Sequence, residues 1–186
     1  MTAGKFEDNN LDDFENLINI NLWGIIRMTK AFYPYFMAQN QGHIVNLSSV
    51  FGLGGVMFQS AYCTAKAGVK GFTESLRMEL LDTNIKTTVV HPGGIKTNIA
   101  RNAPPKSSVI TADKYEAAVK SFDKYAITSS ESAAQQILDA VEKNQDRLVI
   151  GKDGKMMSLM TRLFPVAFTK IMKSKMEEVL TNPYKM

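Results

Sequence analysis

The chain has 186 residues, of which 45% are hydrophobic and 22% charged, and its formal net charge is +4. These values are ordinary for one soluble globular domain. The one cysteine, Cys63, excludes an intrachain disulfide and suits a reducing compartment such as the cytoplasm. No apolar run approaches the roughly eighteen residues of a membrane span, and the polar segment 1–10 is neither a secretion signal nor a transit peptide.

The first predicted element is a helix that runs from residue 11 to about residue 38. Asn10 suits its N-cap, and Asp12 and Asp13 follow in the first turn, where the helix dipole favours negative charge. Pro34 is expected to kink this helix or to end its regular part. An apolar stripe interrupted by one asparagine runs along it: Phe14, Leu17, Ile18, Asn21, Leu22, Ile25 and Met28.

The rest of the chain alternates between strand and helix patterns. It predicts a strand at 43–48, a helix at 60–81, a strand at 86–90, a short helix near 111–123, a helix at 131–143 capped by Ser130, a strand at 147–150, and one or two amphipathic helices from Lys155. Strands separated by helices imply parallel crossovers, so we expect an α/β layer fold. Three strands are few for a parallel sheet, which needs both faces and both edges covered, and this count suggests that strands are missing.

The net charge is concentrated in the tail. Residues 151–186 contain seven Lys or Arg and three Asp or Glu, so the rest of the chain is neutral overall. A basic tail can contact lipid or nucleic acid, but without interleaved aromatic residues a solvated helix face is the simpler interpretation. Six of the eleven methionines also lie in the tail, where they could pack a core or line an adaptable binding surface.

Tyr62 and Lys66 carry the strongest chemical signal. Four residues apart on a helix, they share one face. A cation about 4 Å from the phenol, at an effective dielectric constant of about 20, favours the phenolate by roughly 4 kcal/mol and lowers the tyrosine pKa by about three. Such a tyrosine can transfer protons near pH 7. The alternative is a chance pairing on a surface helix.

Ser49 and Asn21 add to this signal. Ser49 follows the strand at 43–48, and ligands bind at strand carboxyl ends in open α/β sheets. Its hydroxyl can hydrogen-bond a substrate carbonyl oxygen, or it can simply terminate the strand. Asn21 is a poor residue for a helix interior, so its place on an apolar stripe indicates either a function or a satisfied buried amide.

Five segments, in this order and spacing, resemble the second half of the short-chain dehydrogenase/reductase family. The resemblance covers about residues 5–151. The segments are Asn21-Leu-Trp-Gly24, Gly42-His-Ile-Val-Asn-Leu-Ser-Ser49, Tyr62-Cys-Thr-Ala-Lys66, Gly71-Phe-Thr-Glu-Ser-Leu-Arg-Met-Glu-Leu80 and His91-Pro-Gly-Gly-Ile-Lys-Thr97. The resemblance implies a Rossmann-type parallel sheet with helices on both faces, and an oxidoreductase that transfers a hydride between NAD or NADP and a carbonyl or secondary alcohol.

The resemblance also implies a role for each matching residue. Tyr62 would be the general acid or base, Lys66 would lower its pKa and bind the nicotinamide ribose, Ser49 would polarise the substrate oxygen, and Asn21 would hold a water of the proton relay. Further residues would lie along the cofactor: Asn46, Pro92, Gly93, Ile95 and Thr97. The cofactor carries the hydride, and the protein supplies orientation and proton handling.

One departure from the family is large. The glycine-rich turn that receives the pyrophosphate at a helix N-terminus is not found, and Gly52-Leu-Gly54-Gly55 lacks its spacing. We therefore expect an N-terminally truncated fold, with the adenosine-binding half absent from this chain. Residues 1–151 would form the catalytic half of the domain, and residues 152–186 a helical tail that packs on it or shapes its substrate pocket. The alternative function is a non-catalytic fragment that acts as a binding or oligomerisation module.

The expected partners follow from the same resemblance. We expect a small carbonyl or alcohol substrate, no nucleic acid, no membrane, and a homodimer or homotetramer formed through the helices at 11–38 and 60–81. We expect no metal, because His43 and His91 lack ligand spacing, and we assign Cys63 to packing.

Overall fold

The computed structural model describes residues 4–102 and 112–181. Its sheet has three parallel strands in the order β1-β2-β3: β1 (Gly42–Leu47), β2 (Ile85–Pro92) and β3 (Arg147–Ile150). In the register, Gly42 lies opposite Ile85 and Val89 opposite Arg147. The predicted strands and the parallel α/β class are confirmed, including the pairing of the strand at 43–48 with the strand at 86–90.

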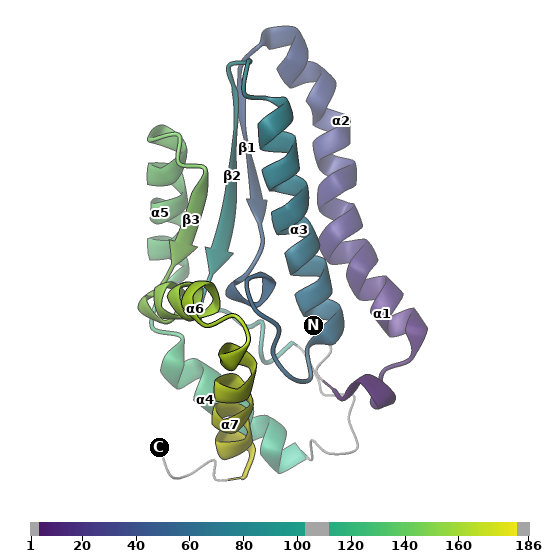
Figure 1. Cartoon of the computed structure of the whole chain (residues 1–186), viewed down its shortest axis with the longest axis vertical. Helices are drawn as coiled ribbons and strands as arrows, with labels where there is room; N and C mark the ends of the chain where they lie inside the picture. Colours follow the sequence, from purple (N-terminus) through teal and green to yellow (C-terminus); the bar gives the residue numbers. More distant parts are fainter. Residues whose placement is uncertain (1–3, 103–111, 182–186) are drawn as a thin grey trace.

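Helices cover both faces of the sheet (Figure 1). On one face α2 (Gly24–Gln39) and α3 (Ser60–Glu79) pack on a core of Ile44, Leu76, Leu80 and Ile85. On the other face α5 (Ser130–Glu142) contributes Ala133 to a core with Val90 and Ile150. Within the described residues β2 is the central strand, and its segment from Thr87 to His91 is buried.

The remaining helices gather at the end of the sheet to which the strands point (Figure 1). They are α4 (Ala112–Tyr125), α6 (Lys152–Leu163) and α7 (Ala167–Thr181). Phe168 of α7 is 2% exposed, and its ring lies against Gly54 in the loop that follows β1. The tail therefore packs against the carboxyl-end loops of the sheet, where an α/β fold places its ligands.

The N-terminal helix is interrupted by a wider turn. A short 3₁₀ segment (Phe6–Asp8) precedes α1 (Leu11–Ile18), and a π-helical segment (Asn19–Trp23) separates α1 from α2. The Asn10 cap is confirmed, because its side chain accepts the Asp13 N–H at 2.8 Å. The predicted end of the helix near residue 38 is confirmed, because α2 continues to Gln39 with Pro34 inside it. Of the two alternatives for Pro34, an end of the regular helix is wrong, and a kink stays a prediction.

The π-helical segment also corrects the predicted apolar stripe. Met28 was expected on the core-facing stripe, but it is 59% exposed, and Thr29 is buried in its place. A π turn has one residue more than an α turn, so positions beyond it rotate to a different face. The stripe was predicted with regular 3.6-residue spacing, and it fails at Met28, whereas Ile25 is half-buried.

Smaller differences concern element ends. The cap of α5 is Ser129, whose side chain accepts the Ser132 N–H, and not Ser130 as predicted. The tail helices begin at Lys152 rather than Lys155. The predicted start of the helix near 111 lies outside the described residues. Across 4–102 and 112–181, no helix is both long enough and apolar enough to cross a membrane.

Candidate active site

Two serines at the end of β1 anchor the site. The Ser48 hydroxyl donates to the Lys66 carbonyl oxygen at 2.7 Å, and the Ser48 N–H donates to the Val90 carbonyl oxygen at 2.8 Å. Ser49 caps the 3₁₀ turn Val50–Gly52, where its side-chain oxygen accepts the Phe51 N–H at 3.1 Å. Both serines are buried. The end of β1 is thereby attached directly to the turn of α3 that carries Lys66.

Tyr62 and Lys66 lie beside this strand end. The Lys66 ammonium nitrogen is 5.7 Å from the centre of the Tyr62 ring and donates to the Leu47 carbonyl oxygen at 3.0 Å. Lys66 is 9% exposed, and the edge of the Tyr62 ring packs against Phe51, with the two ring centres 6.4 Å apart. The pair therefore does not lie on a solvated helix face, and its catalytic role stays a prediction.

The protonation of this pair differs from the prediction. Burial raises the pKa of Tyr62, and a hydrogen bond to Ser49 only partly opposes that shift. Burial lowers the pKa of Lys66. The sequence predicted that the ammonium would lower the tyrosine pKa, but here the ammonium lies over the ring and bonds to Leu47, so desolvation of the phenol dominates. The phenol of this structure is protonated at neutral pH.

Asn21 lies in the π-helical segment and is half-buried. Its amide nitrogen donates to the Leu17 carbonyl oxygen at 3.2 Å. The segment packs on α3, where a Cβ on Gly68 would lie 2.8 Å from a Leu22 methyl, so the two helices approach closely at this position. Asn21 thus lies on a segment that contacts α3 at Gly68, two residues along the chain from Lys66, and π turns are common at functional sites.

The segment that follows β2 contains the other residues predicted to lie along the cofactor. The Gly93 N–H donates to the Ile150 carbonyl oxygen at 2.9 Å, which places Pro92 and Gly93 beside the end of β3. The Ile95 side chain is half-buried and packs against the core that includes Ala133 of α5. Thr97 is exposed, and its hydroxyl oxygen accepts the Ile99 N–H at 3.4 Å.

Asn46 differs from the other predicted cofactor residues because its side chain turns toward α3. It is 6% exposed, and its amide nitrogen donates to the Thr73 hydroxyl at 3.0 Å. Thr73 in turn donates to the Val69 carbonyl oxygen. This chain of bonds holds β1 against α3, which positions Ser49 relative to Lys66.

Asp153 was missed at the sequence level. Its carboxylate accepts the Gly94 N–H at 2.7 Å and so ties the first turn of α6 to the segment after β2. The signal in the sequence was weak: an acidic residue bracketed by Gly151 and Gly154 directly after the last strand. Only the fold brings residue 153 next to residue 94.

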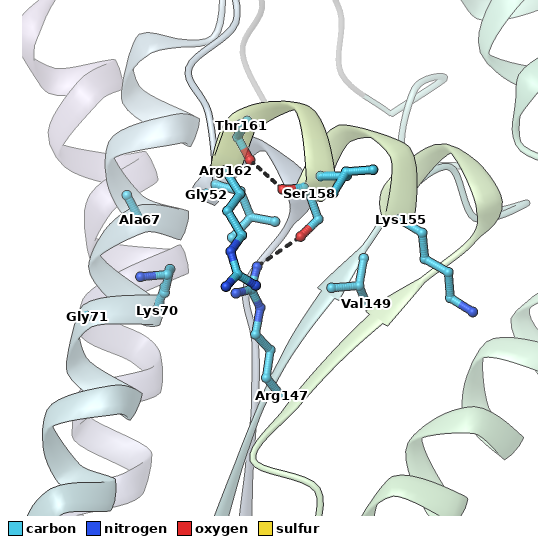
Figure 2. A pocket seen from close by; sticks show the side chains of 12 residues that line it. Gly52, Ala67, Lys70, Gly71, Arg147, Val149, Lys155, Ser158, Thr161 and Arg162 are labelled. Carbon is cyan, nitrogen blue, oxygen red and sulfur yellow. Dashed lines mark hydrogen bonds between the residues drawn. The ribbon is translucent and has the colours of Figure 1, made fainter. Parts of the chain in front are cut away.

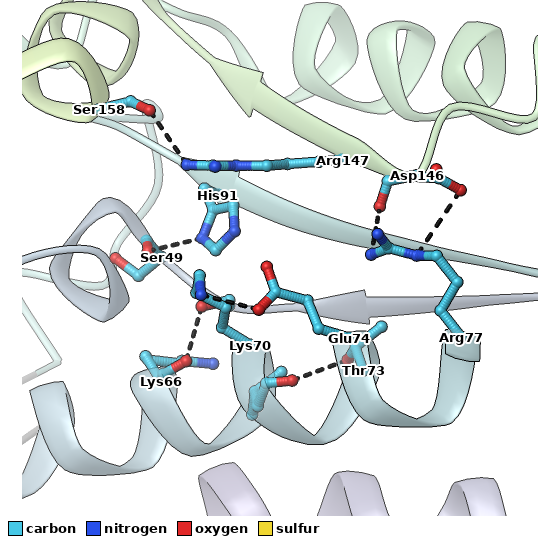
Figure 3. A network of polar contacts seen from close by, with 12 residues as sticks. Ser49, Lys66, Lys70, Thr73, Glu74, Arg77, His91, Asp146, Arg147 and Ser158 are labelled. Carbon is cyan, nitrogen blue, oxygen red and sulfur yellow. Dashed lines mark hydrogen bonds and ion pairs between the residues drawn. The ribbon is translucent and has the colours of Figure 1, made fainter. Parts of the chain in front are cut away.

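His91 lies beneath the site and is fully buried (Figure 3). Its Nδ1 is 3.0 Å from the Ser49 carbonyl oxygen, which can only accept, so Nδ1 carries the proton. Among the described residues, Nε2 has no hydrogen-bond partner. Burial lowers the pKa of His91 to about 4, so the imidazole is neutral at pH 7 and acts as a packing and anchoring group.

Other reactive side chains support no further chemistry at this position. Cys63 is half-buried, and burial raises the pKa of its thiol, which disfavours a nucleophilic thiolate. Within residues 4–102 and 112–181, no group of three His, Cys, Asp or Glu is arranged to hold a metal ion.

A parallel α/β sheet with helices on both faces defines a Rossmann-type architecture, and a serine at a strand's carboxyl end lies beside a helix that carries a Tyr–Lys pair. The sequence profile of the short chain dehydrogenases matches residues 1–108. The chain belongs to the short-chain dehydrogenase/reductase family of oxidoreductases.

Curated relatives agree with this assignment. A Mycobacterium tuberculosis protein named as an oxidoreductase, SadH, is 40% identical over 171 residues, which make up 90% of this chain and 60% of that protein. Mouse dehydrogenase/reductase SDR family member 7B is 34% identical over 173 residues, 92% of this chain and 52% of that protein. The chain therefore spans 52–60% of the length of these two relatives.

Solved structures show the same fold. A short-chain dehydrogenase from Streptomyces avermitilis superimposes with a TM-score of 0.73 at 23% identity, over 97% of this chain and 66% of that one. A short chain dehydrogenase from Burkholderia cenocepacia, solved in complex with NADP, gives a TM-score of 0.69 at 21% identity, over 88% of this chain and 60% of that one.

Proposed function

We propose that this chain carries the proton-transfer half of a nicotinamide-dependent oxidoreductase acting on a carbonyl or a secondary alcohol. The observation that carries the proposal is the shared location of three groups. Tyr62 and Lys66 lie on one face of α3, and Ser49 ends the strand to which that face is attached. Ser49 and Lys66 are buried and Tyr62 is half-buried, and hydrogen bonds and charges act more strongly away from water.

In the reducing direction, the protonated Tyr62 donates its proton to the substrate oxygen. The Ser49 hydroxyl donates a hydrogen bond to the same oxygen and stabilises the charge that develops on it. The Lys66 ammonium stabilises the phenolate that remains, since a nearby cation favours the charged form of an acid. The raised pKa of the free phenol keeps the proton in place until the substrate is bound.

The residues fit the nicotinamide half of NAD or NADP. An ammonium has three N–H donors, and the bond to Leu47 uses one of the Lys66 donors, so two remain to bond the ribose of the nicotinamide half. Pro92, Gly93, Ile95 and Thr97 would line the opposite wall. When bound, the nicotinamide supplies or accepts the hydride.

Asn21 is proposed as the outer member of the relay. Its π-helical segment leaves the backbone pattern irregular beside α3, and polar backbone groups at such turns are available to hold a water. A water held there would connect Lys66 to solvent and return the proton that Tyr62 gives up.

The second candidate is a binding or oligomerisation module. Among the described strands, β1 has β2 as its one neighbour, so one edge of β1 has no strand partner there. The helices at 11–38 also expose apolar side chains, among them Ile20, Phe32 and Tyr35. Both features fit a homodimer or homotetramer through these helices and α3. They are compatible with the enzyme as well, and the proposed location for either is the cytoplasm.

A probe smaller than the whole cofactor tests the proposal directly. Nicotinamide mononucleotide carries the nicotinamide ribose but no adenosine, so its binding depends on the residues described above. Saturation-transfer NMR should detect binding to the chain, loss of binding in Lys66→Met, which keeps the side-chain volume, and no change in Lys30→Met on the exposed face of α2. Equal signals from all three proteins would contradict the proposal and favour the non-catalytic module.

A further inference from the structure

A groove of about 520 Å³ lies between α3, β3 and α6, and the loop that follows Ser49 forms part of its lining (Figure 2). Gly52 and Leu53 form one end, Ala67 and Lys70 of α3 form a wall, and Val149 of β3 forms part of the floor. Neither Ser49, Tyr62, Lys66 nor the segment 92–97 lines the groove. It is therefore separate from the proposed catalytic corner, which consists of Ser49, Tyr62, Lys66 and the segment 92–97.

The lining of the groove is strongly basic. Four of its twelve lining residues are cations, and none is Asp or Glu: Lys70, Arg147, Lys155 and Arg162. Lys70 is neutralised by Glu74, at 2.8 Å. In the described part of the chain, no carboxylate pairs with Arg147, Lys155 or Arg162. Three unpaired cations around one groove repel one another unless an anion lies between them.

The geometry brings Arg147 and Arg162 together, while Lys155 lies toward the other end of the groove (Figure 2). Lys155, Ser158 and Arg162 are spaced by three and four residues along α6 and so share one face of the helix. The Ser158 hydroxyl accepts a hydrogen bond from the Arg147 guanidinium at 3.1 Å, which holds Arg147 against that face. Arg162 lies one turn further along. Figure 2 shows both guanidinium groups directed into the groove, from β3 and from α6.

This arrangement matches a particular ligand chemistry. A guanidinium group presents its N–H donors as a planar fork that bonds two oxygens of a phosphate at once, and two such groups from different elements can hold one phosphate. Ser158 adds a hydroxyl beside them. Leu53, Val149 and Leu159 provide an apolar side against which the organic part of a ligand can lie.

We propose that the groove between α3, β3 and α6 is a binding site for a small phosphate monoester. The dianion would bridge Arg147 and Arg162, with Lys155 supplying additional positive charge. The site is independent of the proposed catalytic corner, because the two share no residue.

Isothermal titration calorimetry at pH 7.5 with glycerol 3-phosphate, and with inorganic phosphate as the minimal probe, tests the proposal. The wild-type chain should bind both. Arg162→Gln should weaken binding about tenfold or more, since it removes charged hydrogen bonds from an exposed helix position. Arg27→Gln is the matched control: it removes the same side chain from α2, outside the groove, and should leave the affinity unchanged.

Two further variants make the result decisive. Arg162→Lys keeps the charge but loses the fork, so it should bind more weakly than the wild type. If Arg162→Lys bound phosphate as tightly as the wild type, binding would depend on positive charge alone and not on the guanidinium fork, and the proposal would be wrong. Arg147→Gln should also lose affinity, and its circular dichroism spectrum separates loss of the site from loss of the fold. Absence of phosphate binding by the wild type, or equal losses in Arg27→Gln and Arg162→Gln, would also show that the proposal is wrong.

Discussion

The corner around β1 and α3 and the groove beneath α6 use charged side chains in opposite ways. In the corner, Lys66 is buried and its ammonium is hydrogen-bonded to Leu47, so its position is determined by packing. In the groove, Arg147 and Arg162 are exposed and lack a carboxylate partner among the described residues. A buried, oriented charge suits proton transfer, whereas exposed and unpaired cations suit capture of an anion from solvent.

The largest expected effect belongs to the corner. In a form of the protein that shows turnover, Tyr62→Phe should lower kcat by about 10²–10⁴-fold, since it deletes the proton donor. Affinity for the cofactor should stay close to that of the wild type. Steady-state assays over a panel of carbonyl substrates with NADH and NADPH measure both quantities.

Tyr35→Phe is the matched control, because Tyr35 is exposed on α2. Near-normal turnover by Tyr62→Phe would remove the tyrosine from the mechanism. A parallel loss in Tyr35→Phe would indicate an indirect effect on folding or association.

The next effect concerns His91 beneath the corner. Its pKa is lowered from 6.5 to about 4. Between pH 6.5 and pH 4, His91 is therefore protonated in the unfolded chain but neutral in the folded chain. The folded pKa is depressed, so the stability contribution is present above pH 6.5 and is lost as pH falls toward 4. The loss amounts to about 3 kcal/mol. Urea unfolding between pH 7 and 4.5 measures it.

The groove residues affect the same titration, since Arg147 and Lys70 lower the His91 pKa and Glu74 raises it. His91→Asn should flatten the pH dependence in this window. His43→Gln is the comparison and should flatten the curve less, because His43 is less buried than His91 and Asp146 opposes the lowering of its pKa by burial. If His43→Gln flattened the curve and His91→Asn did not, the assignment to His91 would be wrong.

Gly52 separates the two regions, and its replacement should disturb both. A Cβ at this position would lie 2.6 Å from the Ser48 hydroxyl oxygen and 2.7 Å from the Lys66 carbonyl oxygen, so the loop or α3 must shift. Gly52→Ala should therefore destabilise the chain by about 1–3 kcal/mol. Chemical denaturation measures the change, with Gly55→Ala as the control, since nothing lies within 4 Å of a Cβ there. Equal stability of the two variants would contradict the contact.

A smaller effect is expected where the tail meets the segment after β2. Asp153→Ala removes the acceptor of the Gly94 N–H and should destabilise that segment by about 1 kcal/mol. Hydrogen exchange at the Gly94 amide should become faster in Asp153→Ala, while Asp153→Asn, which keeps an acceptor oxygen, should remain near the wild-type rate. Unchanged exchange in the alanine variant would show that the bond is not maintained in solution.

Local signals in the sequence were sufficient for most of the fold. Strand and helix periodicity, the Asn10 cap and the strand pairing all depend on neighbours in sequence or on the limited ways in which parallel strands connect. Ser49, Tyr62, Lys66 and Asn21 could be selected because their residue types and spacing match a known family. The roles assigned to them stay predictions until turnover or ligand binding is measured.

Contacts between distant segments were decided by the tertiary structure alone. The bond from Gly94 to Asp153 and the meeting of Arg147 with Ser158 join residues whose positions depend on how α6 folds back over the sheet. The raised pKa of Tyr62 depends on burial, which spacing along one helix does not reveal. The failure of the stripe at Met28 follows from one extra residue in a π turn. Sequence determines which groups are present and their local spacing, whereas packing determines which groups lose water and which partners they meet.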